Sequence, residues 1–203
     1  PAAHRASAPS GQGRRALLPG RLGEAPRLAS RRGPLSGRGV GMDVVRRGVA
    51  ALLEKLGYHQ RKGVYRHPRR KVIFLGDLID RGPRIRLAVS IARRMVEEGE
   101  AHIVMGNHEY NALAYMHPAP PGSAKRWLRE HTPRHNRIIQ DTLDQYRDHT
   151  NEWEDTLAWF KTIPLCLELD GIRVVHACWD DELIRQLRQR SPSAQLDDRF
   201  LVE

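Results

Sequence analysis

The fold is decided by residues 72–83, which read Val-Ile-Phe-Leu-Gly-Asp-Leu-Ile-Asp-Arg-Gly-Pro. The first four residues are of the β-branched, aromatic and aliphatic kinds that favour strands, so they predict a short buried strand. Gly76 ends this strand, and two carboxylates, an arginine, a glycine and a proline follow it. A strand that runs into a charged loop is typical of α/β proteins, which place their chemistry at the carboxyl ends of strands.

Two further stretches repeat this arrangement. Residues 102–105 predict a strand followed by Gly-Asn-His-Glu, and residues 172–175 predict a strand followed by His176. We expect the three strands to deliver Asp77, Asn107 and His176 to one edge of one sheet. Two oxygen donors and one nitrogen donor suit a hard or borderline divalent cation.

These motifs, in this order and each after a strand, resemble those of the calcineurin-like metallophosphoesterases. The resemblance rests on Gly-Asp-Leu-Ile-Asp-Arg-Gly at 76–82, Gly-Asn-His-Glu at 106–109 and Val-Val-His-Ala at 174–177, and it covers about residues 43–185. It is strongest to the branch shared by serine/threonine phosphatases and bacterial dinucleoside-tetraphosphate phosphatases. It implies an α/β fold, here a partial calcineurin-like β-sandwich with flanking helices.

By the same resemblance, three residues would bind metal. Asp77 would bridge two divalent ions, and Asn107 and His176 would bind the second of them; Mn²⁺ is the ion we expect, with Fe, Zn or Mg as alternatives. In the family the first ion takes further ligands from an Asp-x-His before the first helix, but no Asp-x-His precedes Asp43. A Gly-His motif expected after His176 is absent as well, so we expect one ion in place of two.

The remaining motif residues would act on the substrate. Arg81 and Asn107 would hold its phosphate, since a guanidinium offers paired donors to phosphate oxygens. His108 would be the general acid on the leaving oxygen, and Asp80 would hydrogen-bond His108 and favour its protonated form. Glu109 would support the loop through backbone amides.

The implied reaction is hydrolysis of phosphomonoesters or nucleotide phosphoanhydrides by in-line attack of a metal-bound hydroxide, without a phosphoenzyme. The substrate would be a phosphorylated small molecule, a nucleotide or a phosphoprotein. Because ligands of the first ion are missing, we expect impaired activity. The alternative is a non-catalytic, decayed or truncated family member that at most binds phosphate, a metal or a partner.

The net charge of +10 is concentrated near the N-terminal end. Residues 1–41 hold eight arginines and one acid, have no helical or strand period, and are rich in Gly and Pro, so we predict a disordered tail. Two functional readings of this tail are weak. A transit peptide would be amphipathic, which this segment is not, and an RNA-binding arm would carry aromatic residues between its arginines, which are absent here. A third reading is that a frameshift, a mistaken start codon or gene decay replaced the family's own N-terminus. Nucleic-acid binding is not expected.

Residues 42–203 are predicted to form the metallophosphoesterase domain. A β-hairpin is expected around Asp170 and Gly171, and residues 117–161 are expected to be a helical, cap-like insertion that influences substrate choice or only extends the core. Helical periods or capping residues predict helices at 43–56 (capped by Asp43), 85–98, 110–115, 137–146, 152–161 and 181–190.

Cysteine content and hydropathy indicate the compartment. Cys166 and Cys178 are too few for a disulfide framework, suit a reducing compartment and are both expected in the core. No apolar run approaches the length of a membrane span, and no secretory hydrophobic region occurs near the N-terminal end. We therefore predict a cytoplasmic protein without a membrane partner.

Overall fold

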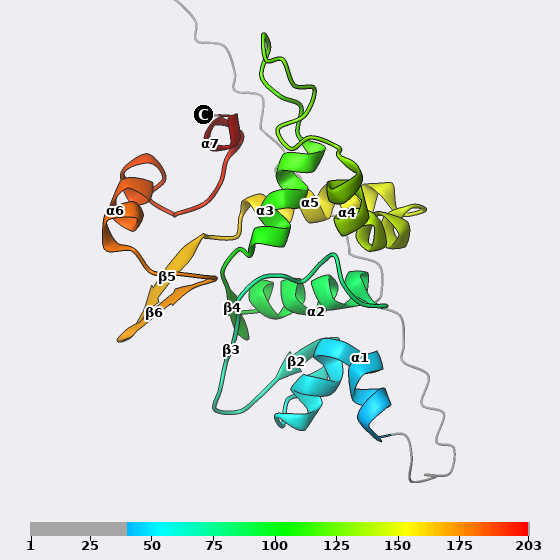
Figure 1. The fold of residues 1–203 in the computed structure, drawn as a ribbon. Coiled ribbons are helices and arrows are strands. Elements are labelled where there is room, and N and C mark those ends of the chain that lie inside the picture. Colours follow the sequence, from blue (N-terminus) through cyan, green and yellow to red (C-terminus); the bar gives the residue numbers. More distant parts are fainter. Residues whose placement is uncertain (1–39, 203) are drawn as a thin grey trace, which may run out of the picture. The chain divides into compact units, whose positions relative to one another are not determined.

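The computed structural model describes residues 40–202, and it describes side chains from residue 48 onward (Figure 1). The predicted tail thus lies outside the described residues, except for its last two positions. The described residues form seven helices and six short strands, which confirms the mixed α/β class. In chain order these are α1 (Val40–Lys55), β1 (His59–Arg61), β2 (Val64–Arg66), β3 (Val72–Phe74), α2 (Ile85–Glu97), β4 (Ala101–Ile103), α3 (Asn107–Met116), α4 (Pro133–Tyr146), α5 (Thr150–Lys161), β5 (Cys166–Leu169), β6 (Ile172–Val175), α6 (Asp181–Arg190) and α7 (Asp198–Val202).

The strands of the described residues form three separate two-stranded sheets. β3 and β4 are parallel and joined by α2, so the predicted strands at 72–75 and 102–105 and the helix between them form a βαβ unit. β1 pairs with β2, and β5 pairs with β6, both antiparallel. The expectation that β6 would share a sheet with β3 and β4 was therefore wrong. The tight Asp170-Gly171 turn pairs β6 with its neighbour in sequence instead.

Helix α2 supplies the centre of the core. Its predicted apolar face is buried, and Ala92 and Met95 are completely inaccessible to solvent. The helix contacts β2, β4, α1 and α4, so it packs the βαβ unit against elements that come before it and after it in the chain. Met95 is a core residue, as expected. Gly99 ends the helix with a left-handed φ of +71°, where the amides of residues 99 and 100 bond back to Val96 and Met95.

Helix α1 differs from its prediction at its start. It begins at Val40, so Asp43 lies inside it instead of capping it. At Gly48 the backbone takes a φ of 55° and a ψ of −136°, which glycine alone adopts readily, and the helix bends there. Its end is as expected: Gly57 has a φ of +84° and closes the last turn. No helix in the described part of the chain has the length and hydropathy that crossing a bilayer requires.

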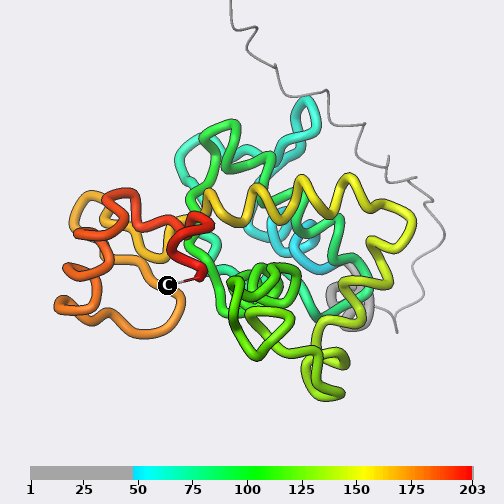
Figure 2. The backbone as a smooth tube through the Cα atoms, turned by 90° about the horizontal axis from the view of Figure 1, so that it is seen from above, coloured from blue at the N-terminus to red at the C-terminus, as the bar shows by residue number. Residues whose placement is uncertain are grey.

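The helices of the predicted insertion pack into the core. α4 contacts α2, and α5 contacts α3. The buried aromatic side chains of α5 belong to the same hydrophobic core. Figures 1 and 2 show this helix pair on the opposite side of the β3–β4 unit from β5, β6 and α6. Ring stacking holds the loop before α4. The centroid of the His131 ring lies 3.7 Å from that of Tyr115 and 4.9 Å from that of Trp127.

The β5–β6 hairpin and α6 share a smaller cluster made of Cys166, Ile184 and Ala194, with Trp179 packed against it. Trp179 therefore covers part of this smaller cluster. Cys166 is buried as predicted, whereas Cys178 is exposed, so the prediction of two core cysteines was wrong for one of them. Helix α7 has no counterpart among the predicted elements.

Two glycines let the ends of β3 and β4 approach each other. Gly76 has a φ of +81°, and a Cβ atom at this position would lie 2.1 Å from the Gly106 backbone nitrogen. A Cβ atom at Gly106 would lie 2.5 Å from both the backbone nitrogen and a carboxylate oxygen of Asp77. Side chains are therefore excluded at both positions, and the two charged segments that follow these strands lie against one another.

Replacing Gly76 with alanine is expected to lower the free energy of unfolding by about 2–5 kcal/mol. The left-handed φ costs an alanine about 1–2 kcal/mol, and forcing the backbone of Gly106 away adds about 1–3 kcal/mol. Gly122→Ala is the matched control, because Gly122 has a φ of +87° but no atom within 4 Å of its added Cβ. Urea unfolding followed by circular dichroism measures both, and equal losses would contradict the close approach.

Candidate active site

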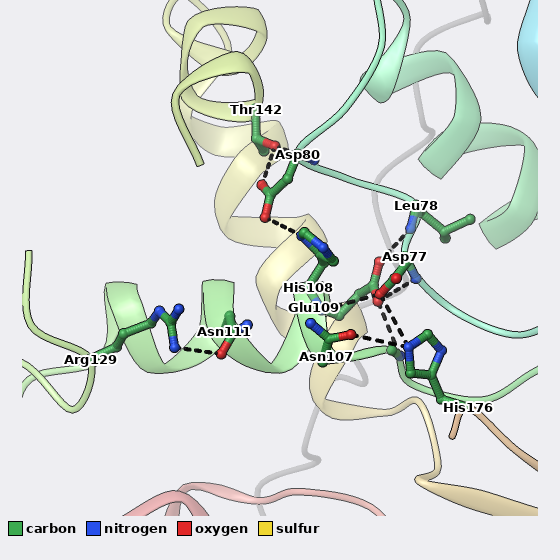
Figure 3. Close-up of polar contacts among 11 residues, drawn as sticks. Asp77, Leu78, Asp80, Asn107, His108, Glu109, Asn111, Arg129, Thr142 and His176 are labelled. Carbon is green, nitrogen blue, oxygen red and sulfur yellow. Dashed lines mark hydrogen bonds and ion pairs between the residues drawn. The ribbon is translucent and has the colours of Figure 1, made fainter. Parts of the chain in front are cut away.

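The three residues predicted as metal ligands meet at one point (Figure 3). His176 Nε2 lies 3.1 Å from Asn107 Oδ1 and 3.6 Å from Asp77 Oδ1. Asp77 follows β3, Asn107 is in the first turn of α3, and His176 follows β6. Although β6 is not in the β3–β4 sheet, the His176 ring bonds through Nδ1 to the carbonyl oxygen of Leu75, just after β3. This hydrogen bond brings the third residue to the other two.

The protonation of the His176 ring makes this meeting point a candidate cation site. A carbonyl oxygen only accepts hydrogen bonds, so Nδ1 carries a proton, and the Nε2 of a neutral ring turns its lone pair toward Asn107 and Asp77. With the Asn107 amide oxygen turned toward the ring, three acceptor atoms face one another, and a cation bound between them would satisfy all three. A backbone carbonyl behind the ring is the usual partner of a metal-binding histidine.

The distances fit a shared ion. Ligand atoms about 2.1 Å from one ion are about 3.0 Å apart at a right angle and about 3.4 Å apart at a tetrahedral angle. The observed separations of 3.1 and 3.6 Å from His176 Nε2 are close to these values. Within the described residues no three His, Cys, Asp or Glu side chains form a metal-binding group, so the amide oxygen of Asn107 is needed as the third ligand.

A second arrangement joins Asp80 and His108. His108 Nδ1 lies 2.7 Å from Asp80 Oδ2, which is the hydrogen bond that the sequence led us to expect. His108 lies in the first turn of α3, next to Asn107, and not in a loop as predicted. Asp80 is buried, and its backbone φ of +70° is unusual for a residue with a side chain. The surrounding structure therefore holds this carboxylate in a strained position beside the imidazole.

Beneath both arrangements lies the completely buried carboxylate of Glu109. It accepts hydrogen bonds from the backbone amides of Asp77 at 2.8 Å, Leu78 at 2.7 Å and Gly106 at 3.1 Å. The predicted support of the loop through backbone amides is thus confirmed. Burial raises the pKa of the Glu109 carboxyl above its ordinary value, and the hydrogen bonds from Asp77 and Leu78 oppose this rise.

Comparison with known proteins identifies the arrangement. The family model described as calcineurin-like phosphoesterase matches residues 46–203, which include every motif residue named above. This chain belongs to the calcineurin-like phosphoesterase family. The sequence-based assignment to this family is confirmed.

Several curated relatives of this family member share one name, bis(5'-nucleosyl)-tetraphosphatase PrpE [asymmetrical]. The protein from Oceanobacillus iheyensis is 28% identical over 148 residues, which are 69% of this chain and 54% of that protein. The protein from Halalkalibacterium halodurans is 39% identical over 66 residues, 32% of this chain and 27% of that one. The protein from Geobacillus thermodenitrificans is 48% identical over 63 residues, 30% and 26% respectively. The matches thus span about half of these relatives' length or less.

Among the motif residues of this calcineurin-like domain, Arg81 has the least defined surroundings. It is exposed, and its guanidinium forms no hydrogen bond or ion pair with any described residue. It directly follows the anchored Asp80, so its backbone position is fixed while its side chain is available to a ligand. Leu75 is also exposed, at 51%, although the sequence placed it in a buried strand; β3 ends at Phe74.

One contact of the calcineurin-like site had no signal in the sequence. The side chain of Thr142, in α4, donates to Asp80 Oδ1 at 2.7 Å and accepts from the Asp80 amide at 2.8 Å. Another link, from Arg129 to Asn111 Oδ1 at 2.8 Å, ties the loop before α4 to the second turn of α3 (Figure 3). Neither Thr142 nor Arg129 lies in a recognisable motif. The predicted helix over 137–146 contains Thr142, but nothing in the sequence indicated its contact with Asp80.

Replacing Glu109 with alanine is expected to lower the free energy of unfolding by about 3 kcal/mol or more, because three backbone amides lose their acceptor and each costs about 1–3 kcal/mol when unpaired. Glu97→Ala is the control. Glu97 is 44% exposed and pairs with Arg93 at 2.8 Å, so its loss is expected to cost about 0.5 kcal/mol. Urea unfolding measures the free energy of unfolding of both variants. Similar decreases in the two would show that Glu109 does not hold the two segments together.

Proposed function

We propose that this chain is a metal-dependent phosphohydrolase that acts on nucleotide phosphoanhydrides and also on phosphomonoesters. The observation that supports this most directly is the convergence of His176 Nε2, Asn107 Oδ1 and Asp77 Oδ1 on one point next to a histidine that is hydrogen-bonded to a buried aspartate. The name of these relatives, bis(5'-nucleosyl)-tetraphosphatase, supports a dinucleoside polyphosphate as the substrate class.

Asp77, Asn107 and His176 would hold the divalent ion, for which Mn²⁺ is our proposal, with Fe, Zn or Mg as alternatives. A divalent ion in such a site polarises the phosphoryl group and lowers the pKa of water. Two oxygen donors and one imidazole nitrogen are acceptable to each of these ions. The hydrogen bond from His176 Nδ1 to Leu75 keeps Nε2 directed at the ion site, whatever substrate is bound.

The other motif residues would bind the substrate and transfer a proton. The guanidinium of Arg81, which has no partner among the described residues, can form paired hydrogen bonds to two phosphate oxygens, and the side chain of Asn107 is exposed as well. His108 would deliver a proton from Nε2 to the leaving oxygen. Asp80 is bound to the other ring nitrogen, Nδ1, and therefore holds the ring in one orientation and leaves Nε2 available for transfer.

The sequence also limits the proposed activity. No Asp-x-His precedes Asp43, so a second ion finds no matching ligand pair in this chain. We propose that the chain binds one ion and turns over more slowly than a relative that holds two. If turnover is absent, the chain would be a binding protein for phosphate or metal, which is the alternative that the sequence left open.

Metal binding can be measured without any assumption about turnover. Calorimetry with MnCl₂ is expected to give one site per chain, and Asp77→Ala and His176→Ala are expected to abolish it, because each removes one of three ligands. His149→Ala is the control, since His149 is exposed and in no motif. Two tight sites would refute the single-ion proposal, and retention of binding in both variants would place the ion elsewhere.

The proton transfer is tested by changing the leaving group. With Mn²⁺ present, His108→Gln is expected to lower kcat about 10²-fold or more with phenyl phosphate and much less with p-nitrophenyl phosphate, whose leaving group needs little protonation. Asp77→Ala is expected to abolish hydrolysis of both, and of diadenosine tetraphosphate, while His149→Ala leaves it intact. Equal losses on the two esters would argue against His108 as the acid.

A further inference from the structure

Helix α4 reaches the charged loop after β3 at two points. Thr142, which is completely buried, binds Asp80, and Gln145 binds Gly82 of the same loop and Ile85 at the start of α2. Thr142 and Gln145 are three residues apart and so lie on one face of the helix. Both are 60 or more residues from their partners in sequence. They belong to the segment that the sequence placed in an insertion, outside every motif.

We propose that Thr142 and Gln145 are positioning residues of the active site: Thr142 sets the orientation of the Asp80–His108 pair, and Gln145 sets the loop that presents Arg81. This inference rests on the proposed function for its kinetic consequences, but the positioning itself is measurable in a chain without turnover. Neither residue needs to touch the substrate.

Thr142 holds Asp80 through both functions of its hydroxyl group. The hydroxyl accepts from the Asp80 amide at 2.8 Å and donates to Oδ1 at 2.7 Å, which leaves Oδ2 for His108 Nδ1 at 2.7 Å (Figure 3). Backbone and side chain of Asp80 are thus fixed together, at a φ of +70° that most residues avoid. Without the hydroxyl, the carboxylate is free to rotate about its χ angles, and the His108 ring loses its fixed partner.

Gln145 holds the part of the loop that follows Arg81. Its Oε1 accepts from the Ile85 amide at 2.7 Å, and its Nε2 donates to the Gly82 carbonyl at 2.9 Å. The residue before α2, Arg84, forms no capping hydrogen bond with its own side chain, so Gln145 supplies the acceptor that this helix start lacks. Arg81 therefore lies between two anchored positions, Asp80 and Gly82, and its backbone cannot shift without breaking one of these bonds.

The role of Thr142 is tested with Thr142→Val, which keeps shape but removes the hydroxyl, and Thr142→Ser, which restores it. Thr142→Val is expected to lower kcat about tenfold on phenyl phosphate, with recovery in Thr142→Ser. In an Asp80→Asn background Thr142→Val is expected to cause no further loss, because its effect passes through Asp80. Additive losses, or failure of serine to rescue, would overturn the proposal. Thr156→Val is the matched control, a buried threonine of α5 whose hydroxyl bonds, among the described residues, the Glu152 carbonyl and Tyr146.

A second readout does not require turnover. The low-field proton NMR signal of the His108 Nδ1–H group, assigned by its loss in His108→Gln, is expected in the wild type, Thr142→Ser and Thr156→Val, and is expected to vanish in Thr142→Val through faster exchange with water. Persistence of the signal in Thr142→Val would overturn the positioning role. Absence of turnover in the wild type with this pattern intact would refute the proposed function alone.

The role of Gln145 is read from substrate binding. Gln145→Ala is expected to raise KM about fivefold with kcat nearly unchanged, and in parallel to weaken the binding of inorganic phosphate in the presence of Mn²⁺ by a similar factor. Gln140→Ala is the control, because Gln140 is exposed on the same helix and its side chain bonds Asp144 and no other residue in the described part of the chain. Unchanged phosphate affinity in Gln145→Ala would overturn this part of the proposal, whether or not the chain turns over substrate.

Discussion

The structure depends on one buried anion, the carboxylate of Glu109, bound by three backbone amides. Two of these amides belong to the segment after β3 and one belongs to the segment after β4, so a single side chain holds the ends of both parallel strands. A buried carboxylate is costly unless it is hydrogen-bonded, and the raised pKa of this group shows that the cost is not fully offset. The two glycines that adjoin it, Gly76 and Gly106, allow the approach that makes the bonds possible.

This arrangement places the chemistry of the site in a strained segment. Asp77 and Asp80 both have positive φ values, 58° and 70°, which cost residues with side chains stability of about 1–3 kcal/mol each. Two side chains stabilise this strained backbone: Glu109 accepts a hydrogen bond from the Asp77 amide, and Thr142 of α4 accepts one from the Asp80 amide. The side chains of the candidate site are therefore held in place within the fold itself, at the expense of local stability.

Much of the site could be read from the sequence, because its residues lie in short motifs after strands. The apolar period of α2, the hairpin at Asp170-Gly171 and the pairing of Asp80 with His108 were all predictable on this basis. The sheet arrangement was not, because a parallel and an antiparallel neighbour for β6 present the same apolar pattern, and only tertiary contacts decide between them. Thr142 was not predictable either, since a hydrogen bond across 62 residues leaves no local trace.

The insertion extends the core and also reaches the candidate site. Ile139, Thr142 and Tyr146 lie on the same buried face of α4: Ile139 and Tyr146 join the core, and Thr142 bonds Asp80 in the loop after β3. Gln145, one turn from Thr142, bonds the same segment further along. A helix fixed by core packing is a rigid support for a hydrogen bond, whereas a loop in the same place would move with its own thermal motion. Extension of the core is thus the condition under which α4 can influence the site. Changes in the packing of α4 should then reach Asp80 and Arg81 through the backbone of their loop, without any contact between the insertion and a substrate.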